Sequence, residues 1–135
     1  MKIKTISVSR NLYSNYIKKA EEFLASAQRS FEEREWNAAA LGSIHSAISA
    51  ADALCVYFLG VRHAGEKHED AINLFKTIKL EKEELAANSR RISRILGYKT
   101  MAEYEERLVH EPEAESAIKD AVRLLRFVKS NLPKE

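Results

Sequence analysis

The stretch that decides the fold is WNAAALGSIHSAISAADALCVYFLG, residues 36–60. It carries one formal charge, Asp52, in a chain in which 31% of the residues are charged. A helix that is apolar on every side must be covered all round by neighbouring elements. We therefore expect a central helix that ends at Gly60, with the other helices wrapped around it. Its many Ala, Ser and Gly residues would let those helices approach closely.

A membrane span is the alternative interpretation, because the stretch is long enough to cross a bilayer. Its Ala, Ser and Gly residues supply little transfer energy, and Asp52 near the middle would cost about 3 kcal/mol. No aromatic belt or flanking basic cluster marks an orientation. We therefore predict a buried core helix and no membrane association.

Length and composition favour one all-helical domain over residues 1–135. The chain has only four Gly and two Pro for turns, and its one cysteine, Cys55, excludes an intramolecular disulfide. The N-terminus has no apolar segment of the kind found in secretion signals, so we expect a cytoplasmic protein. A net charge of +2 is too small to indicate nucleic-acid binding by overall charge. Such binding would need a local basic patch.

Apolar residues recur at helical spacing in four further stretches of the chain. Together with the central helix they predict an up-and-down bundle of about five helices. The four stretches run over residues 11–31, 68–79, 82–97 and 112–132.

Local signals place the helix ends and the connections between them. Asn37 is a candidate N-cap of the central helix, Gly97 is expected to end the fourth helix, and Pro112 occupies the first turn of the last. Residues 98–111 are compatible with a short helix or an ordered connection. Residues 1–9 are β-prone, and with no second strand to pair with they are expected to form an extended lead-in.

Metal and cofactor chemistry finds no support in the sequence. Di-metal carboxylate bundles need Glu-x-x-His pairs on inward faces, and the chain has none. His63 and His68 lie five residues apart, a spacing that fits neither a helical His-Glu-x-x-His site nor a zinc finger. Phosphate-binding Gly-rich loops and a Ser nucleophile elbow are also missing. We expect no metal and no cofactor.

Functional side chains concentrate just after the central helix, where Arg62, His63, Lys67 and His68 fall within seven residues. Arg presents a fixed fork of donors to phosphate oxygens, and His exchanges protons near neutral pH. The alternative is that this segment is a solvated turn and that His68 simply begins a helix.

Two ionisable residues lie inside the central helix itself. His45 and Asp52 are seven residues apart and therefore share one stripe of that helix. A carboxylate among apolar residues needs a partner, so we expect Asp52 to meet a cation or a histidine, or to orient Arg62 or His68. For His45, a buried hydrogen-bonded network that fixes helix register is the favoured interpretation.

Four segments together resemble the HEPN (higher eukaryote and prokaryote nucleotide-binding) superfamily. They are YIKKAEEFLASAQRSFEEREWNAAA, SIHSAISAADALCVYFLG, the pattern R-x-x-G-x-x-H-x-x-A-x-x-L-F from Arg62, and K-x-x-A-E-Y from Lys99. The resemblance covers most of residues 12–130 and is greatest to small stand-alone prokaryotic members. It implies a bundle of about five helices that pairs into a homodimer, with a polar cleft at or near the dimer interface.

Many HEPN proteins are metal-independent ribonucleases, often toxins, whose site is an Arg followed by a polar residue and then a His. Here five residues separate Arg62 from His68, which satisfies the spacing of that motif. The resemblance implies that a histidine deprotonates the ribose 2′-hydroxyl while Arg62 stabilises charge on the phosphate. Asp52, His63, Lys67 and His45 are candidates for supporting or substrate-binding roles.

The sequence departs from the toxin branch in one respect. There the Arg and the His usually share one helix late in the domain, whereas Gly65 places Arg62 and His68 in a loop before the third helix. Other family members bind nucleotides without cleaving RNA, or act as partners of minimal nucleotidyltransferases in toxin–antitoxin pairs. A non-catalytic adaptor and a plain helical dimerisation module are therefore the alternatives to a ribonuclease.

Overall fold

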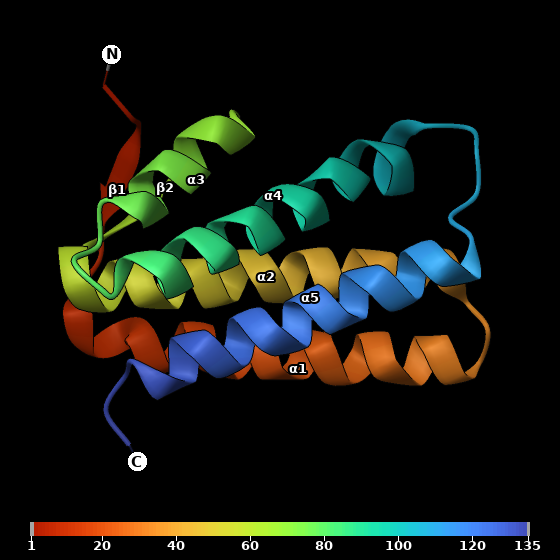
Figure 1. Ribbon diagram of the computed structural model, residues 1–135, viewed down its shortest axis with the longest axis horizontal. Helices are drawn as coiled ribbons and strands as arrows, with labels where there is room; N and C mark the ends of the chain where they lie inside the picture. Colours follow the sequence, from red (N-terminus) through yellow and green to blue (C-terminus); the bar gives the residue numbers. More distant parts are fainter. Residues whose placement is uncertain (1, 135) are drawn as a thin grey trace.

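The computed structural model describes residues 2–134, and five helices dominate them (Figure 1). The expected all-α, up-and-down bundle is confirmed. In chain order the elements are β1 (Thr5–Ser7), a 3₁₀ turn η1 (Arg10–Leu12), α1 (Tyr13–Glu32), α2 (Trp36–Leu59), β2 (Val61–His63), α3 (His68–Lys76), α4 (Lys82–Tyr104) and α5 (Glu111–Ser130).

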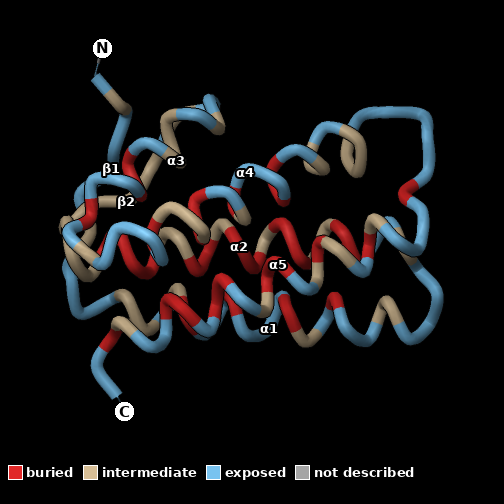
Figure 2. The backbone as a smooth tube through the Cα atoms, viewed as in Figure 1, coloured by how far each residue is buried: buried red, intermediate tan, exposed pale blue. Residues whose placement is uncertain are grey.

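Helix α2 is the core of the bundle and contacts all four other helices. Figure 1 shows α3 and α4 on one side of it and α1 on the other. Figure 2 shows buried segments along most of its length. Small residues let the neighbours approach: Gly42 packs against the α1 backbone, and the Ser46 hydroxyl donates to the Ala20 carbonyl at 2.8 Å.

The length and composition of α2 would allow it to cross a membrane, but its surroundings explain its apolar character. In its most apolar 18-residue window, 67% of the residues are buried inside the bundle. A core helix of a soluble domain meets the same criteria of length and hydropathy as a membrane span. The packing of α2 thus accounts for its composition without a bilayer.

The sequence predicted the C-terminal end of α2 correctly but not its N-terminal end. Gly60 ends the helix with φ of 71°, a left-handed conformation that glycine adopts readily. The prediction that Asn37 caps the other end is wrong, because the helix already begins at Trp36. The Asn37 Oδ1 instead accepts a hydrogen bond from the Val109 amide at 2.9 Å. It therefore holds the α4–α5 connection against α2.

Residues 5–7 do find a strand partner, contrary to the expectation from the sequence. β1 pairs antiparallel with β2, with Ile6 opposite Arg62 and Thr5 opposite His63. Further backbone bonds extend the pairing, from Val8 to the Gly60 carbonyl and from Ala64 to the Lys4 carbonyl, both at 3.0 Å. The segment after Gly60 was expected to be a loop because three residues are too few to show strand periodicity.

The prediction that Gly97 ends the fourth helix is also wrong, since α4 continues to Tyr104. Gly97 is exposed, and a glycine inside a helix costs only about 1 kcal/mol. Packing offsets this cost: Met101 and Ala102 lie against a buried cluster made of Ala39, Ala40, Val109 and Ala114. Tertiary contacts thus stabilise the helix beyond Gly97. Residues 98–104, which were compatible with either a helix or a connection, are therefore helical.

An ion pair fixes α4 on α5. The Arg94 guanidinium donates two hydrogen bonds to the Asp120 carboxylate, at 3.0 and 2.9 Å. Asp120 is buried, whereas the Arg94 side chain is half exposed. This two-point contact sets the orientation of the helix that forms one wall of the cleft described below.

Gly97→Ala should raise the free energy of unfolding by about 0.5–1 kcal/mol, because the position is exposed helix with no heavy atom within 4 Å of an added Cβ. Urea denaturation followed by circular dichroism measures the change.

The matched variant is Gly42→Ala, where the added Cβ would lie 3.0 Å from the Ala27 Cβ and 3.1 Å from the Phe23 carbonyl oxygen. This crowding should outweigh the helix propensity of alanine and lower the stability. A loss of stability in Gly97→Ala would contradict the continuous α4.

Candidate functional site

A cleft of about 720 Å³ opens between α2, α4 and the β2–α3 segment. Three groups of residues line it. α2 contributes Ile48, Ala51, Asp52 and Cys55; β2, the turn and α3 contribute Arg62, His63, Ala64, Gly65, Glu66, His68 and Ala71; and α4 contributes Ile92, Leu96, Lys99, Thr100 and Tyr104.

Helical periodicity explains which residues of α2 and α4 face the cleft. The four residues from α2 follow the i, i+3, i+4, i+7 spacing of one helix face. The stripe from α4 changes in character along its length, from the buried Ile92 and Leu96 to the polar Lys99 and Thr100 and the exposed Tyr104. The cleft therefore has an apolar inner part and a polar, aromatic rim.

The β1–β2 ladder positions Arg62 and His63 at the edge of this cleft. Strand pairing fixes the backbone of both residues directly after the Gly60 turn. The Arg62 side chain is half-buried, and its Nη1 donates to the His63 carbonyl at 3.2 Å. With one donor committed to the backbone, the remaining donors of the guanidinium are available to a ligand.

His63 packs against the turn that follows it. Its Nε2 is buried and has no hydrogen-bond partner among residues 2–134. A Cβ added to Gly65 would lie 3.2 Å from this nitrogen. The turn can pass this close to the imidazole because residue 65 has no side chain. Burial lowers the pKa of His63, and Asp70 opposes this effect while His68 and Arg62 add to it. A neutral His63 is thus favoured at neutral pH.

Asp52 is the charged group on the α2 side of the cleft. Burial raises the pKa of its carboxyl to about 7, although the positive charges of Arg62 and Lys19 oppose the shift. The sequence predicted a paired Asp52. In the described part of the chain no ion pair to it forms, and the two cations act on it only through space. Its proton is therefore exchangeable near neutral pH.

The structure brings together Arg62, His68, His63 and Asp52 of the residues predicted from the sequence, but not Lys67 and His45. Lys67 is exposed and precedes α3 without lining the cleft. His45 stacks against Phe23 of α1, with ring centroids 5.3 Å apart. It therefore packs between helices, and no network of hydrogen bonds involving His45 forms among residues 2–134.

Sequence reasoning did not place Lys99, Thr100 and Tyr104 in the site, although the segment from Lys99 to Tyr104 carries part of the HEPN resemblance, because the fourth helix was expected to end at Gly97. Lys99 lies 3.3 Å from the Glu103 carboxylate and 6.0 Å from the centre of the Tyr104 ring. A signal was present in the sequence: Lys99 and Glu103 have the i, i+4 spacing of a helical ion pair.

Among residues 2–134, no three His, Cys, Asp or Glu side chains converge on a point that could hold a metal ion. The basic, acidic and imidazole groups that line the cleft are one guanidinium, one ammonium, two imidazoles and two carboxylates.

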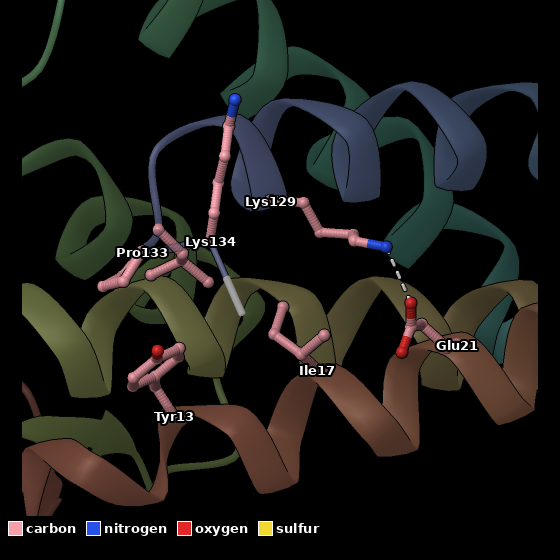
Figure 3. Close-up of a pocket in the computed structure, with 7 residues that line it drawn as sticks. Tyr13, Ile17, Glu21, Lys129, Pro133 and Lys134 are labelled. Atoms are coloured by element: carbon pink, nitrogen blue, oxygen red, sulfur yellow. Dashed lines mark hydrogen bonds and ion pairs between the residues drawn. The ribbon is translucent and has the colours of Figure 1, made fainter.

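A second hollow, of about 300 Å³, lies where α1 meets the end of α5 (Figure 3). Tyr13 and Ile17 line one side, and Lys129 reaches across to Glu21 at 2.7 Å. This ion pair engages two of the three charged side chains that line the hollow, the third being Lys134, and no histidine or arginine lines it. The larger cleft is therefore the better candidate.

The chain is a five-helix bundle whose cleft is lined by an arginine, a lysine and two histidines. A comparison with protein-family models matches the HEPN domain over residues 13–131. The chain thus belongs to the HEPN family, as the resemblance implied, and a nucleotide- or RNA-related role is the general function that goes with this domain. No curated protein matches the chain.

Asp52→Asn should raise the free energy of unfolding at pH 8 by about 1–3 kcal/mol, with little gain at pH 4. Folding raises the pKa of Asp52 from 3.8 to about 7. The contribution of Asp52 to the free energy of unfolding of the wild type therefore falls as the pH rises from about 4 to 7. An amide removes the cost of burying the ionised carboxylate.

Urea denaturation of both proteins at the two pH values isolates this contribution, because all other titrating groups are shared. An equal effect at pH 4 and pH 8 would contradict the assignment to Asp52 ionisation.

Proposed function

We propose that the cleft binds RNA or the phosphate of a nucleotide, and that it cleaves RNA without a metal ion. The observation that carries the proposal is that Arg62 and His68, from different elements, line the same cleft in a HEPN domain. Arg supplies a fork of donors that matches phosphate oxygens. His supplies a proton acceptor suited to neutral pH.

In the proposed reaction His68 accepts the proton of a ribose 2′-hydroxyl. The 2′-oxygen then attacks the adjacent phosphorus, and the bond from phosphorus to the 5′-oxygen of the next nucleotide breaks. The leaving 5′-oxygen takes up a proton, so the products are a 2′,3′-cyclic phosphate and a 5′-hydroxyl. Arg62 stabilises the negative charge that develops on the phosphate oxygens.

One histidine cannot be both base and acid in the same step. A homodimer in which the two-fold axis brings two copies of His68 together would supply both groups, so we propose a composite site at a dimer cleft. Light scattering coupled to size exclusion should then give a mass twice the 15.4 kDa of one chain. A monomer at micromolar concentration would contradict the composite site.

A second candidate is a non-catalytic nucleotide-binding adaptor, such as the antitoxin-type partner of a minimal nucleotidyltransferase. The observation that favours it is the placement of Arg62 in a strand and of His68 at the start of α3. The two residues sit on separate elements joined through Gly65, unlike the single helix that carries both in the toxin branch. Binding without cleavage would use Arg62 and leave His68 without an essential role.

Purified protein should cleave total RNA in the presence of EDTA and leave cyclic phosphate ends, while His68→Ala and Arg62→Ala should each lose at least about 100-fold in rate, the usual contribution of a general base or of a charge-stabilising donor. His68→Gln should bind RNA but not cleave it.

The matched control is Arg126→Ala, which removes an exposed arginine of α5 that lies outside the cleft and should cleave as wild type does. Intact RNA together with nucleotide binding that depends on Arg62 would favour the adaptor. The absence of both activities would favour a plain dimerisation module.

A further inference from the structure

Tyr104 is a large aromatic residue that the fold leaves uncovered. It is the last residue of α4, it lines the cleft and its relative exposure is 75%. Met101 and Ala102 anchor this last turn of α4 to the buried cluster beside it. The position of Tyr104 at the rim is therefore fixed by packing, while its ring remains open to a ligand.

Lys99 lies five residues before Tyr104 in α4 and adds a positive charge beside the ring. Its ammonium is 6.0 Å from the centre of the Tyr104 ring and 3.3 Å from the Glu103 carboxylate. Its side chain is only 27% exposed, so the cation is held in place. Lys99 lies over one face of the Tyr104 ring, and its ion pair with Glu103 engages only part of its three donors. The α4 wall thus presents an exposed aromatic ring together with a cation, and Arg62 supplies a second cation from the β2 wall of the same cleft.

A ring with one cation beside it and a second cation on another wall of the same cleft matches the chemistry of one unpaired nucleotide. Aromatic side chains stack on nucleobases of any sequence, and basic groups beside them follow the phosphates. A base inside a duplex is already stacked on its neighbours and offers no free face to such a ring.

Resting on the proposed function, we propose that Tyr104 stacks on a nucleobase while Lys99 and Arg62 contact its phosphate, which makes single-stranded RNA or a free nucleotide the ligand of the cleft. Recognition of the base by stacking alone discriminates little between the four bases. The cleft would then select unpaired over paired nucleotides more strongly than one sequence over another.

Titration calorimetry with AMP and with ribose 5-phosphate separates the base from the phosphate. Wild type should bind AMP roughly 5- to 150-fold more tightly than ribose 5-phosphate, the contribution of one base–aromatic stack. Tyr104→Ala should reduce this ratio to near one and leave the affinity for ribose 5-phosphate unchanged. Tyr104→Phe should keep the ratio, because the phenyl ring still stacks.

Leu108→Ala is the matched control, since it removes another exposed apolar side chain, 67% exposed and outside the cleft, and should behave as wild type. Equal binding of AMP and ribose 5-phosphate by wild type would overturn the stacking role and leave the phosphate site standing. Binding of neither would overturn the proposed function itself. A ratio that persists in Tyr104→Ala would place the base elsewhere in the cleft.

Discussion

Burial of α2 on every side is the constraint on which the rest of this structure depends. A helix without a polar face has no stable place at a surface, so α1, α3, α4 and α5 must all contact it. Its small residues let them approach closely, as at Gly42, where an added Cβ would lie 3.2 Å from the Ala27 Cα of α1. Because the surrounding helices are positioned by this one element, so are the walls of the cleft beside it.

The burial of α2 also raises the pKa of Asp52, the one acidic residue within its apolar stretch. The central helix holds Asp52 in buried surroundings that disfavour its ionised form, and the positive charges of Arg62 and Lys19 oppose this effect on its pKa. A ligand phosphate placed at Arg62 would weaken one of those influences and favour protonation of Asp52 further. An anion bound at Arg62 would therefore favour uptake of a proton by Asp52.

The parts of the fold that sequence reasoning located are those with strong local signals: the apolar run of α2, the Gly60 stop and the proline start of α5. The parts it missed depend on contacts between residues far apart in the chain. β1 has no partner until β2 is known, and α4 passes Gly97 because Met101 and Ala102 pack on a cluster assembled from α2 and α5. The same holds for the site. Arg62 and His68 could be recognised because they are close in sequence, whereas Lys99 and Tyr104 line the cleft only because α4 continues beyond Gly97.

The solitary thiol of the chain has a practical consequence. Cys55 is 3% exposed, and burial together with the nearby Asp52 raises its pKa to about 12. Maleimide and iodoacetamide reagents attack the thiolate, so the native sulfur is shielded from them both sterically and by its protonation. A cysteine introduced at an exposed position would be the one reactive attachment point for a fluorophore or spin label, without first removing Cys55 from the core.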